Sequence, residues 1–298
     1  MEQFCVKASP SEELRGWYWP AEAPRANLTV ITGMDEYAAR YDAFARWMNE
    51  REINVWVLDA FGQGLNAESA ERQELWPKDA FRKTLRAIHG MNRLARQNGL
   101  QTVQMGHSMG SFLTQALIEK YPHYTDKVIL CGSNGGQDAL MKTGYALSRL
   151  LVNDRNRDEP SSVLQSMGLG SYARSVKGRK TDFDWLSVNE ENVQDYIRDP
   201  YCGQINSGGF WREFLRGMAQ IWDRRSLRHI SEQERILIIS GADDPVGRMG
   251  KGPQWLYDKY RELGVQDVSL RLYEGMRHEI LHETDREKVF TDILAFIL

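Results

Sequence analysis

Apolar and polar positions alternate along the first third of the chain in a pattern typical of strands followed by helices. Short apolar runs predict strands at residues 15–19, 26–32, 54–59, 101–105 and 127–132. Between them, apolar residues at helical spacing predict helices at residues 37–51, 79–97 and 111–121. This alternation predicts a mostly parallel sheet with helices on both faces.

The alternation stops in the middle of the chain and then returns. Residues 135–230 contain no continuous apolar run that predicts a buried strand, and they are rich in charged and aromatic residues. Strands are predicted again at 235–240 and 268–273, and helices at 253–263 and 285–297. We therefore predict an α/β core formed by residues 1–134 and 231–298, with a helical cap inserted at 135–230.

Composition limits the possible functions. The chain has 298 residues, of which 42% are apolar and 27% are charged, as is usual for a globular enzyme. Its net charge is −3, so it has no excess of positive charge that would attract nucleic acid or an anionic membrane. No apolar run approaches the roughly 18 residues of a membrane helix, and the first residues do not follow the pattern of a secretory signal. The three cysteines, Cys5, Cys131 and Cys202, are too scattered for a disulfide framework or metal site. We expect a cytoplasmic protein without cofactor or metal, of undetermined oligomeric state.

The most informative motif is Gly106-His107-Ser108-Met109-Gly110, which stands between a predicted strand and a predicted helix. A G-x-S-x-G sequence in this context is the nucleophile elbow, a tight turn that exposes a serine hydroxyl above the sheet. Ser108 is therefore the candidate nucleophile.

A nucleophilic serine needs a general base, and the base needs a carboxylate to orient it. Asp243 and Asp244 follow the predicted strand at 235–240, and His278 follows the strand at 268–273. This is the chain order Ser, Asp, His of the α/β-hydrolases, with each residue at a strand end. We favour Asp244, because Pro245 fixes the turn after it, and His278 over His282, because His278 lies nearer the strand end.

The tetrahedral intermediate of acyl transfer needs N–H donors for its oxyanion. The sequence indicates two backbone donors, the N–H of Met109, which follows the candidate nucleophile, and the N–H of Met34, in the loop after the strand at 26–32. Gly33 would let that loop approach the substrate closely.

Together these residues resemble α/β-hydrolases of the monoacylglycerol lipase and lysophospholipase type, which are also grouped with serine aminopeptidases. The resemblance spans nearly the whole chain and includes residues 32–41, which resemble the loop H-G-x-x-E-H-x-x-R-Y, the G-H-S-M-G elbow, and the segments at 244–246, 275–279 and 192–203. The chain departs from the family pattern at Thr32, where His is usual, at Tyr37, and at residues 59–64, where D-A-F-G-Q-G replaces D-x-R-G-H-G. These departures concern the support of the oxyanion loop.

The resemblance implies an α/β-hydrolase fold and a serine hydrolase that cleaves a lipid-like or other small ester, such as a monoacylglycerol or lysophospholipid. An aminopeptidase is the alternative, with Glu190, Glu191 or Asp195 as candidates to hold a free amine. A non-catalytic binding protein of the same fold is a third hypothesis. Aromatic cap residues could line the acyl pocket, whereas the basic residues of the cap, such as Arg174 and Arg179, are expected to form a solvated face.

Overall fold

The computed structural model describes residues 1–298 and contains one eight-stranded sheet with the strand order β1-β2-β4-β3-β5-β6-β7-β8. The strands are β1 (Glu2–Lys7), β2 (Glu13–Trp19), β3 (Ala26–Ile31), β4 (Ile53–Leu58), β5 (Gln101–His107), β6 (Lys127–Cys131), β7 (Arg235–Gly241) and β8 (Asp267–Tyr273). Strands β3 to β8 are parallel to one another, while β2 is antiparallel to both β1 and β4. The mostly parallel sheet predicted from the sequence is confirmed.

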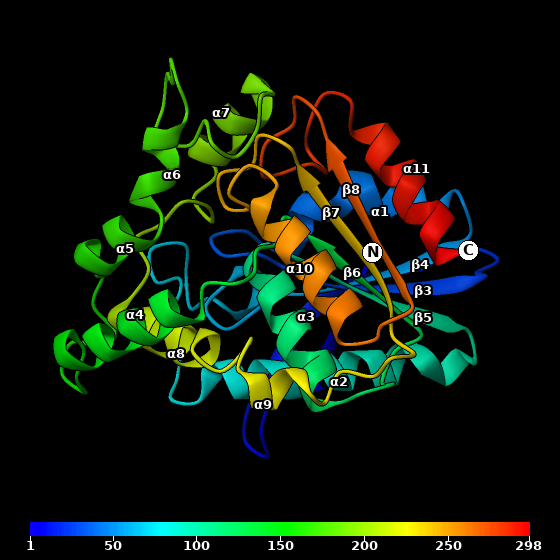
Figure 1. Cartoon of the computed structure of the whole chain (residues 1–298), viewed down its shortest axis with the longest axis horizontal. Coiled ribbons are helices and arrows are strands. Elements are labelled where there is room, and N and C mark those ends of the chain that lie inside the picture. The colour runs from blue at the N-terminus through cyan, green and yellow to red at the C-terminus, as the bar shows by residue number, and fades with distance from the viewer.

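Helices cover both faces of the sheet (Figure 1). They are α1 (Asp42–Asn49), α2 (Ala80–Ala95), α3 (Met109–Lys120), α10 (Lys251–Glu262) and α11 (Arg286–Ile297). Alternate residues of a strand point to opposite faces, so that Val128 of β6 belongs to the hydrophobic cluster that includes residues of α3 and α10, and Ile129 to the cluster that includes residues of α1 and α11. This two-sided burial explains the continuous apolar runs of the central strands.

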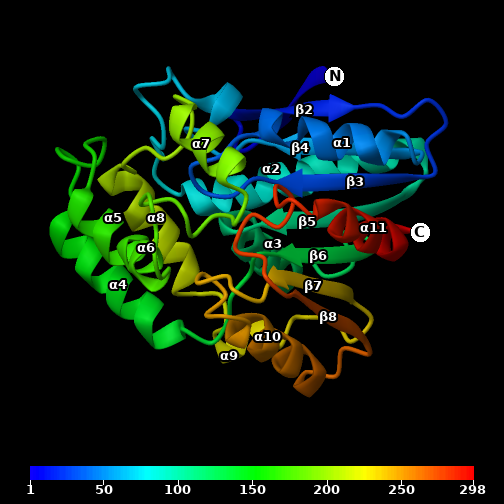
Figure 2. The same cartoon turned by 90° about the horizontal axis from the view of Figure 1, so that it is seen from above.

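A group of helices without strands lies between β6 and β7. It consists of α4 (Asp138–Leu151), α5 (Ser162–Gly168), α6 (Gly170–Ser175), α7 (Glu190–Arg198), α8 (Gly208–Met218) and α9 (Arg224–Leu227). Figure 2 shows α4 to α8 gathered at one end of the sheet. The division into a core and a cap with boundaries near residues 134 and 231 stays a prediction.

The structure differs from the predicted elements at the N-terminal end. Strand β1 has no counterpart among the predicted strands, because at the edge of the sheet only Val6 of its six residues is buried and no apolar run marks it. The helix predicted at 37–51 begins as a 3₁₀ turn, η1 (Ala38–Tyr41), before α1. Short 3₁₀ turns also occur as η2 (Gly64–Asn66) and η3 (Arg96–Asn98). None of the helices is long and apolar enough to span a membrane.

Candidate active site

Ser108 occupies the sharp turn between β5 and α3, with φ of 51° and ψ of −118°. This left-handed backbone is costly for a residue with a side chain and persists only where the surroundings enforce it. The Ser108 N–H donates to the carbonyl of Cys131 on the neighbouring strand at 2.9 Å, which fixes the turn. Helix α3 begins at the next residue, Met109.

The two glycines of the G-x-S-x-G motif are required by close backbone contacts. A Cβ on Gly106 would lie 2.1 Å from the carbonyl oxygen of Gly110, and a Cβ on Gly110 would lie 2.2 Å from that of Ile31. Both distances are much shorter than a van der Waals contact, and both atoms belong to the backbone, so they cannot move aside as the end of a flexible side chain could. Only glycine at these positions lets α3 pack against β5 and β3 at the angle that the turn needs.

His278 and Asp244 meet across the ends of two neighbouring strands. Asp244 follows β7, His278 follows β8, and the His278 Nδ1 lies 3.0 Å from the Asp244 Oδ2. The Asp244 carboxylate also accepts the Val246 N–H at 2.8 Å and the Ser240 hydroxyl at 3.2 Å. Asp244 is fully buried and His278 is 2% exposed. These contacts hold the carboxylate in place and fix the orientation of the imidazole ring.

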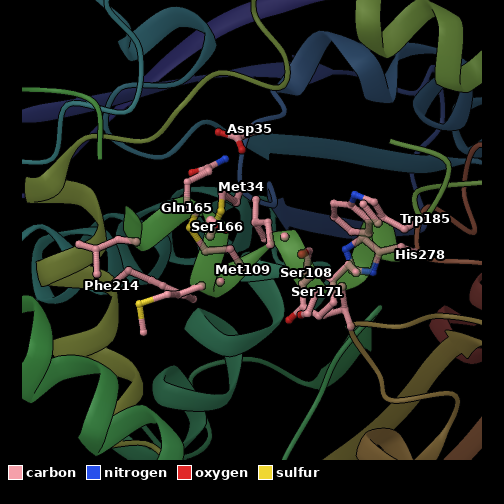
Figure 3. Close-up of a pocket in the computed structure, with 18 of the residues that line it drawn as sticks. Met34, Asp35, Ser108, Met109, Gln165, Ser166, Ser171, Trp185, Phe214 and His278 are labelled. Atoms are coloured by element: carbon pink, nitrogen blue, oxygen red, sulfur yellow. The ribbon is translucent and has the colours of Figure 1, made fainter. Parts of the chain in front are cut away.

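Ser108 and His278 line the same cavity (Figure 3). The Ser108 side chain is partly exposed, and its hydroxyl makes no hydrogen bond within the protein, to His278 or to any other residue. Trp185, which comes from the segment before α7, lies over His278 with ring centroids 5.2 Å apart. The structure thus brings the histidine and the aspartate into direct contact and places the serine on the wall of the cavity that the histidine also borders.

The alternative residues of the two loops, Asp243 and His282, take no part in the contact between Asp244 and His278. Asp243 is exposed to solvent, whereas its neighbour Asp244 is buried against His278. His282 lies behind the site, beside Tyr41 and Glu279. Burial, and then the positive charge of Arg40, lower the pKa of His282 to about 4. It contacts neither Ser108 nor Asp244.

The backbone N–H groups of Met34 and Met109 donate no hydrogen bond within the protein. Met109 is the first residue of α3, so its N–H has no partner in the helix and carries the partial positive charge of a helix N-terminus. Both residues line the cavity beside Ser108, and the Cβ of Ser108 lies 3.0 Å from where a Cβ on Gly33 would be. Unpaired N–H groups beside a serine hydroxyl are suited to bind an oxyanion.

Sequence reasoning did not identify the buried ionic network behind these donors. The Glu36 carboxylate accepts hydrogen bonds from the Gly33 N–H and from the Tyr41 hydroxyl, and lies 2.7 Å from the His107 Nδ1. Burial alone would raise the pKa of Glu36, but the positive charges of His107 and Arg40 outweigh burial and lower it. Glu36 is therefore a carboxylate that anchors the loop carrying Met34.

A second part of this network joins the loop of His278 to α7. The Arg40 guanidinium donates to both oxygens of Glu279, at 2.5 and 3.0 Å, and to the Asn192 side chain at 3.2 Å. Burial opposes the charge on Glu279, yet Arg40 keeps the pKa of this carboxyl far below its ordinary value. The acidic position after His278 and the Arg40 of the R-Y pair are the sequence signals that could have revealed this contact.

The cavity has a volume of about 670 Å³, within the range of small-molecule sites. Seven of the ten aromatic residues between positions 135 and 230 line it, namely Tyr172, Phe183, Trp185, Tyr196, Trp211, Phe214 and Trp222. Phe210, by contrast, is fully buried and packs edge-on against Trp76. The aromatic residues of this segment therefore divide between the cavity wall and the protein core.

Most charged residues of the segment 135–230 do not line the cavity. Only Arg174 and Arg179 of the basic residues line it, and both are exposed. The three acidic candidates for amine binding, Glu190, Glu191 and Asp195, are exposed and none lines it. Glu190 pairs with Lys180, and Asp195 pairs with Arg198. No cluster of His, Cys, Asp and Glu side chains has the arrangement of a metal site.

Comparison with known proteins finds a matching family model and relatives that are similar over most of the chain. The family model Hydrolase_4, described as "Serine aminopeptidase, S33", matches residues 22–285. The chain is 24% identical to a monoacylglycerol lipase of Mycolicibacterium smegmatis, over 94% of this chain and 90% of that protein. It is 23% identical to the phospholipase YtpA of Bacillus subtilis, over 94% of this chain and 98% of that one.

Solved structures share the fold over nearly the whole chain. A thermostable carboxyl esterase from Bacillus coagulans in complex with glycerol superimposes with a TM-score of 0.90 at 22% identity, covering 99% of this chain and 97% of the esterase. A monoglyceride lipase variant from Saccharomyces cerevisiae in complex with a substrate analogue gives 0.76 at 16% identity, covering 99% and 94%. Both likenesses establish the α/β-hydrolase architecture expected from the sequence.

Proposed function

Because the chain belongs to the serine aminopeptidase (S33) family of α/β-hydrolases and is a hydrolase of the lipase and esterase type, we propose that it cleaves carboxylic esters by a Ser108–His278–Asp244 triad. The observation that carries this proposal is the buried 3.0 Å contact between His278 and Asp244 at the wall of a cavity that Ser108 also lines. A histidine oriented by a carboxylate beside a strained serine is the arrangement that activates a hydroxyl.

The proposed reaction follows from these positions. The Ser108 oxygen attacks the ester carbonyl while His278 takes the hydroxyl proton, and Asp244 stabilises the resulting imidazolium. The carbonyl oxygen becomes an oxyanion held by the N–H groups of Met34 and Met109. Collapse of this intermediate breaks the ester bond, and His278 gives its proton to the leaving alcohol. Water then attacks the acyl-enzyme by the same steps, releasing the carboxylic acid and free Ser108.

The proposed substrates are monoacylglycerols, lysophospholipids or similar lipid-like esters of small size. Aromatic and aliphatic side chains form much of the cavity wall, including Phe214, Trp211 and Met218, and these side chains favour an acyl chain over a peptide. The relatives include a monoacylglycerol lipase and a phospholipase, which also supports a lipid-like ester as the substrate. In this proposal residues 135–230 act as the cap that supplies these walls.

Direct assays separate this function from its alternatives. We expect Ser108-dependent hydrolysis of p-nitrophenyl esters and of a monoacylglycerol, with little turnover of aminoacyl-naphthylamides. The Ser108→Ala variant should lose ester hydrolysis while keeping the wild-type fold by circular dichroism. Faster hydrolysis of aminoacyl-naphthylamides than of esters would favour the aminopeptidase. A protein that hydrolyses neither and is not labelled by a fluorophosphonate would be a binding protein.

A further inference from the structure

Three hydrogen bonds hold the peptide group that carries the Met34 N–H and the peptide groups directly before and after it. The Gly33 N–H donates to the Glu36 carboxylate, and the Asp35 N–H donates to Glu74 Oε1 at 3.3 Å. The Gly33 carbonyl accepts the Gln63 Nε2 at 2.7 Å. Met34 itself is left with an unpaired N–H. Since a trans peptide directs its C=O and N–H to opposite sides, the bond from Gln63 sets the direction of the Met34 N–H.

The orientation of the Gln63 amide is itself determined by its neighbours. Its Oε1 accepts the Thr32 hydroxyl at 3.0 Å and the Ala60 N–H at 3.3 Å. The Ala60 N–H can only donate, which identifies the atom it faces as the amide oxygen, so the amide nitrogen faces the Gly33 carbonyl, which can only accept. Gln63 is 1% exposed and Thr32 is fully buried, which excludes competition from solvent.

Thr32 and Gln63 are also two of the positions at which the chain departs from the family pattern, where histidine is usual at each. They contact one another directly. The two departures therefore form one hydrogen-bonded pair, which connects the loop after β4 to the loop after β3.

On the basis of the proposed function, we infer that Gln63 is a positioning residue for ester hydrolysis, and that Thr32 holds its amide in the donating orientation. Through the Gly33 carbonyl, Gln63 directs the Met34 N–H toward the oxyanion. A hydrogen bond accepted by the carbonyl of a peptide also polarises that peptide and strengthens its N–H as a donor. This effect grows as negative charge develops, so it acts on the transition state more than on the bound substrate.

The test replaces the amide without changing its size. Gln63→Met removes the donor to Gly33, and we expect kcat for a p-nitrophenyl ester to fall about 10- to 100-fold, less than the roughly 10²- to 10³-fold loss of a whole oxyanion donor. We expect KM to change less than about threefold, and inhibition by a trifluoromethyl ketone, which forms an oxyanion on the serine, to weaken in parallel with kcat. Thr32→Val should give a smaller loss of the same kind, and the double variant no more than Gln63→Met alone.

Gln104→Met is the matched control. Gln104 is an equally buried amide on β5, bonded to Thr29 and Asn92 away from the cavity, and its loss should leave kcat and ketone inhibition unchanged. A folded Gln63→Met protein with wild-type kcat and ketone inhibition would overturn the inference, as would equal losses in Gln104→Met. If Gln63→Met does not fold, the same two measurements are made on Thr32→Val, and wild-type kcat and ketone inhibition in that variant would overturn the inference. Absence of any Ser108-dependent turnover in the wild type would instead refute the proposed function, and this inference with it.

Discussion

Glu119 offers a quantitative test of the structure. It lies near the C-terminal end of α3, the helix that begins at the Ser108 turn, and is only 7% exposed. Its carboxyl group receives one long hydrogen bond, from the Trp222 N–H at 3.5 Å. Burial, together with the nearby charge of Asp223, raises the pKa of Glu119 from 4.5 to about 8. At neutral pH this side chain is therefore mostly protonated in the folded protein.

The sign of the pH effect follows from the number of protons bound. Below pH 4.5 the folded and unfolded states both carry the proton, so burial of Glu119 imposes no ionisation cost. Between pH 4.5 and 8 only the unfolded state releases it, and the free energy of unfolding decreases as pH rises. At about 1.4 kcal/mol for each tenfold change in proton affinity, the cost at pH 7 is about 3 kcal/mol.

The variant Glu119→Gln keeps the shape and the acceptor for Trp222 but does not ionise. We expect it to raise the free energy of unfolding by about 3 kcal/mol at pH 7 and to change it little near pH 4. Urea denaturation at the two pH values measures both quantities, with the exposed Glu22→Gln as the control. Equal effects of Glu119→Gln at pH 4 and pH 7, or a destabilised variant at pH 7, would show that the folded protein does not hold Glu119 protonated.

Three further predictions concern the site. Asp244→Asn should lower kcat about 10⁴-fold in esterase assays, because it removes the carboxylate that orients His278. Asp243→Asn should keep a kcat near that of the wild type, and similar losses of kcat in both variants would reject the choice of Asp244. Gly110→Ala should abolish labelling by a fluorophosphonate, because its Cβ would meet the carbonyl of Ile31 at 2.2 Å; normal labelling would show that the turn can relax. Arg40→Met should cost about 3–5 kcal/mol in urea denaturation, because it leaves the buried Glu279 carboxylate unpaired, and an unchanged midpoint would contradict that role.

Much of the core could be predicted from the sequence because its signals are local. Strands buried on both faces, such as β4 and β7, appear as uninterrupted apolar runs. The turn at Ser108 is marked by glycines that its backbone contacts require. Strand β1 escaped prediction because an edge strand with one buried residue carries no such signal.

The support of the candidate site depends on contacts between residues distant in the chain, which no local pattern reveals. Arg40 meets Glu279 across 239 positions, and Gln63 meets Gly33 across 30. The departures at Thr32 and Gln63 were visible in the sequence, but only the structure shows that the two side chains bond to each other. Likewise, the aromatic residues of the segment 135–230 could not be divided between cavity and core before their packing was known.

The proposed function requires Ser108 to be the nucleophile of an ester hydrolase. Its most direct measurement is mass spectrometry of the protein after reaction with a fluorophosphonate. We expect a single adduct on the peptide that contains Ser108, loss of ester hydrolysis in proportion to labelling, and no adduct in Ser108→Ala. An adduct on another residue that accompanies loss of activity, or full ester turnover by Ser108→Ala, would contradict this role of Ser108.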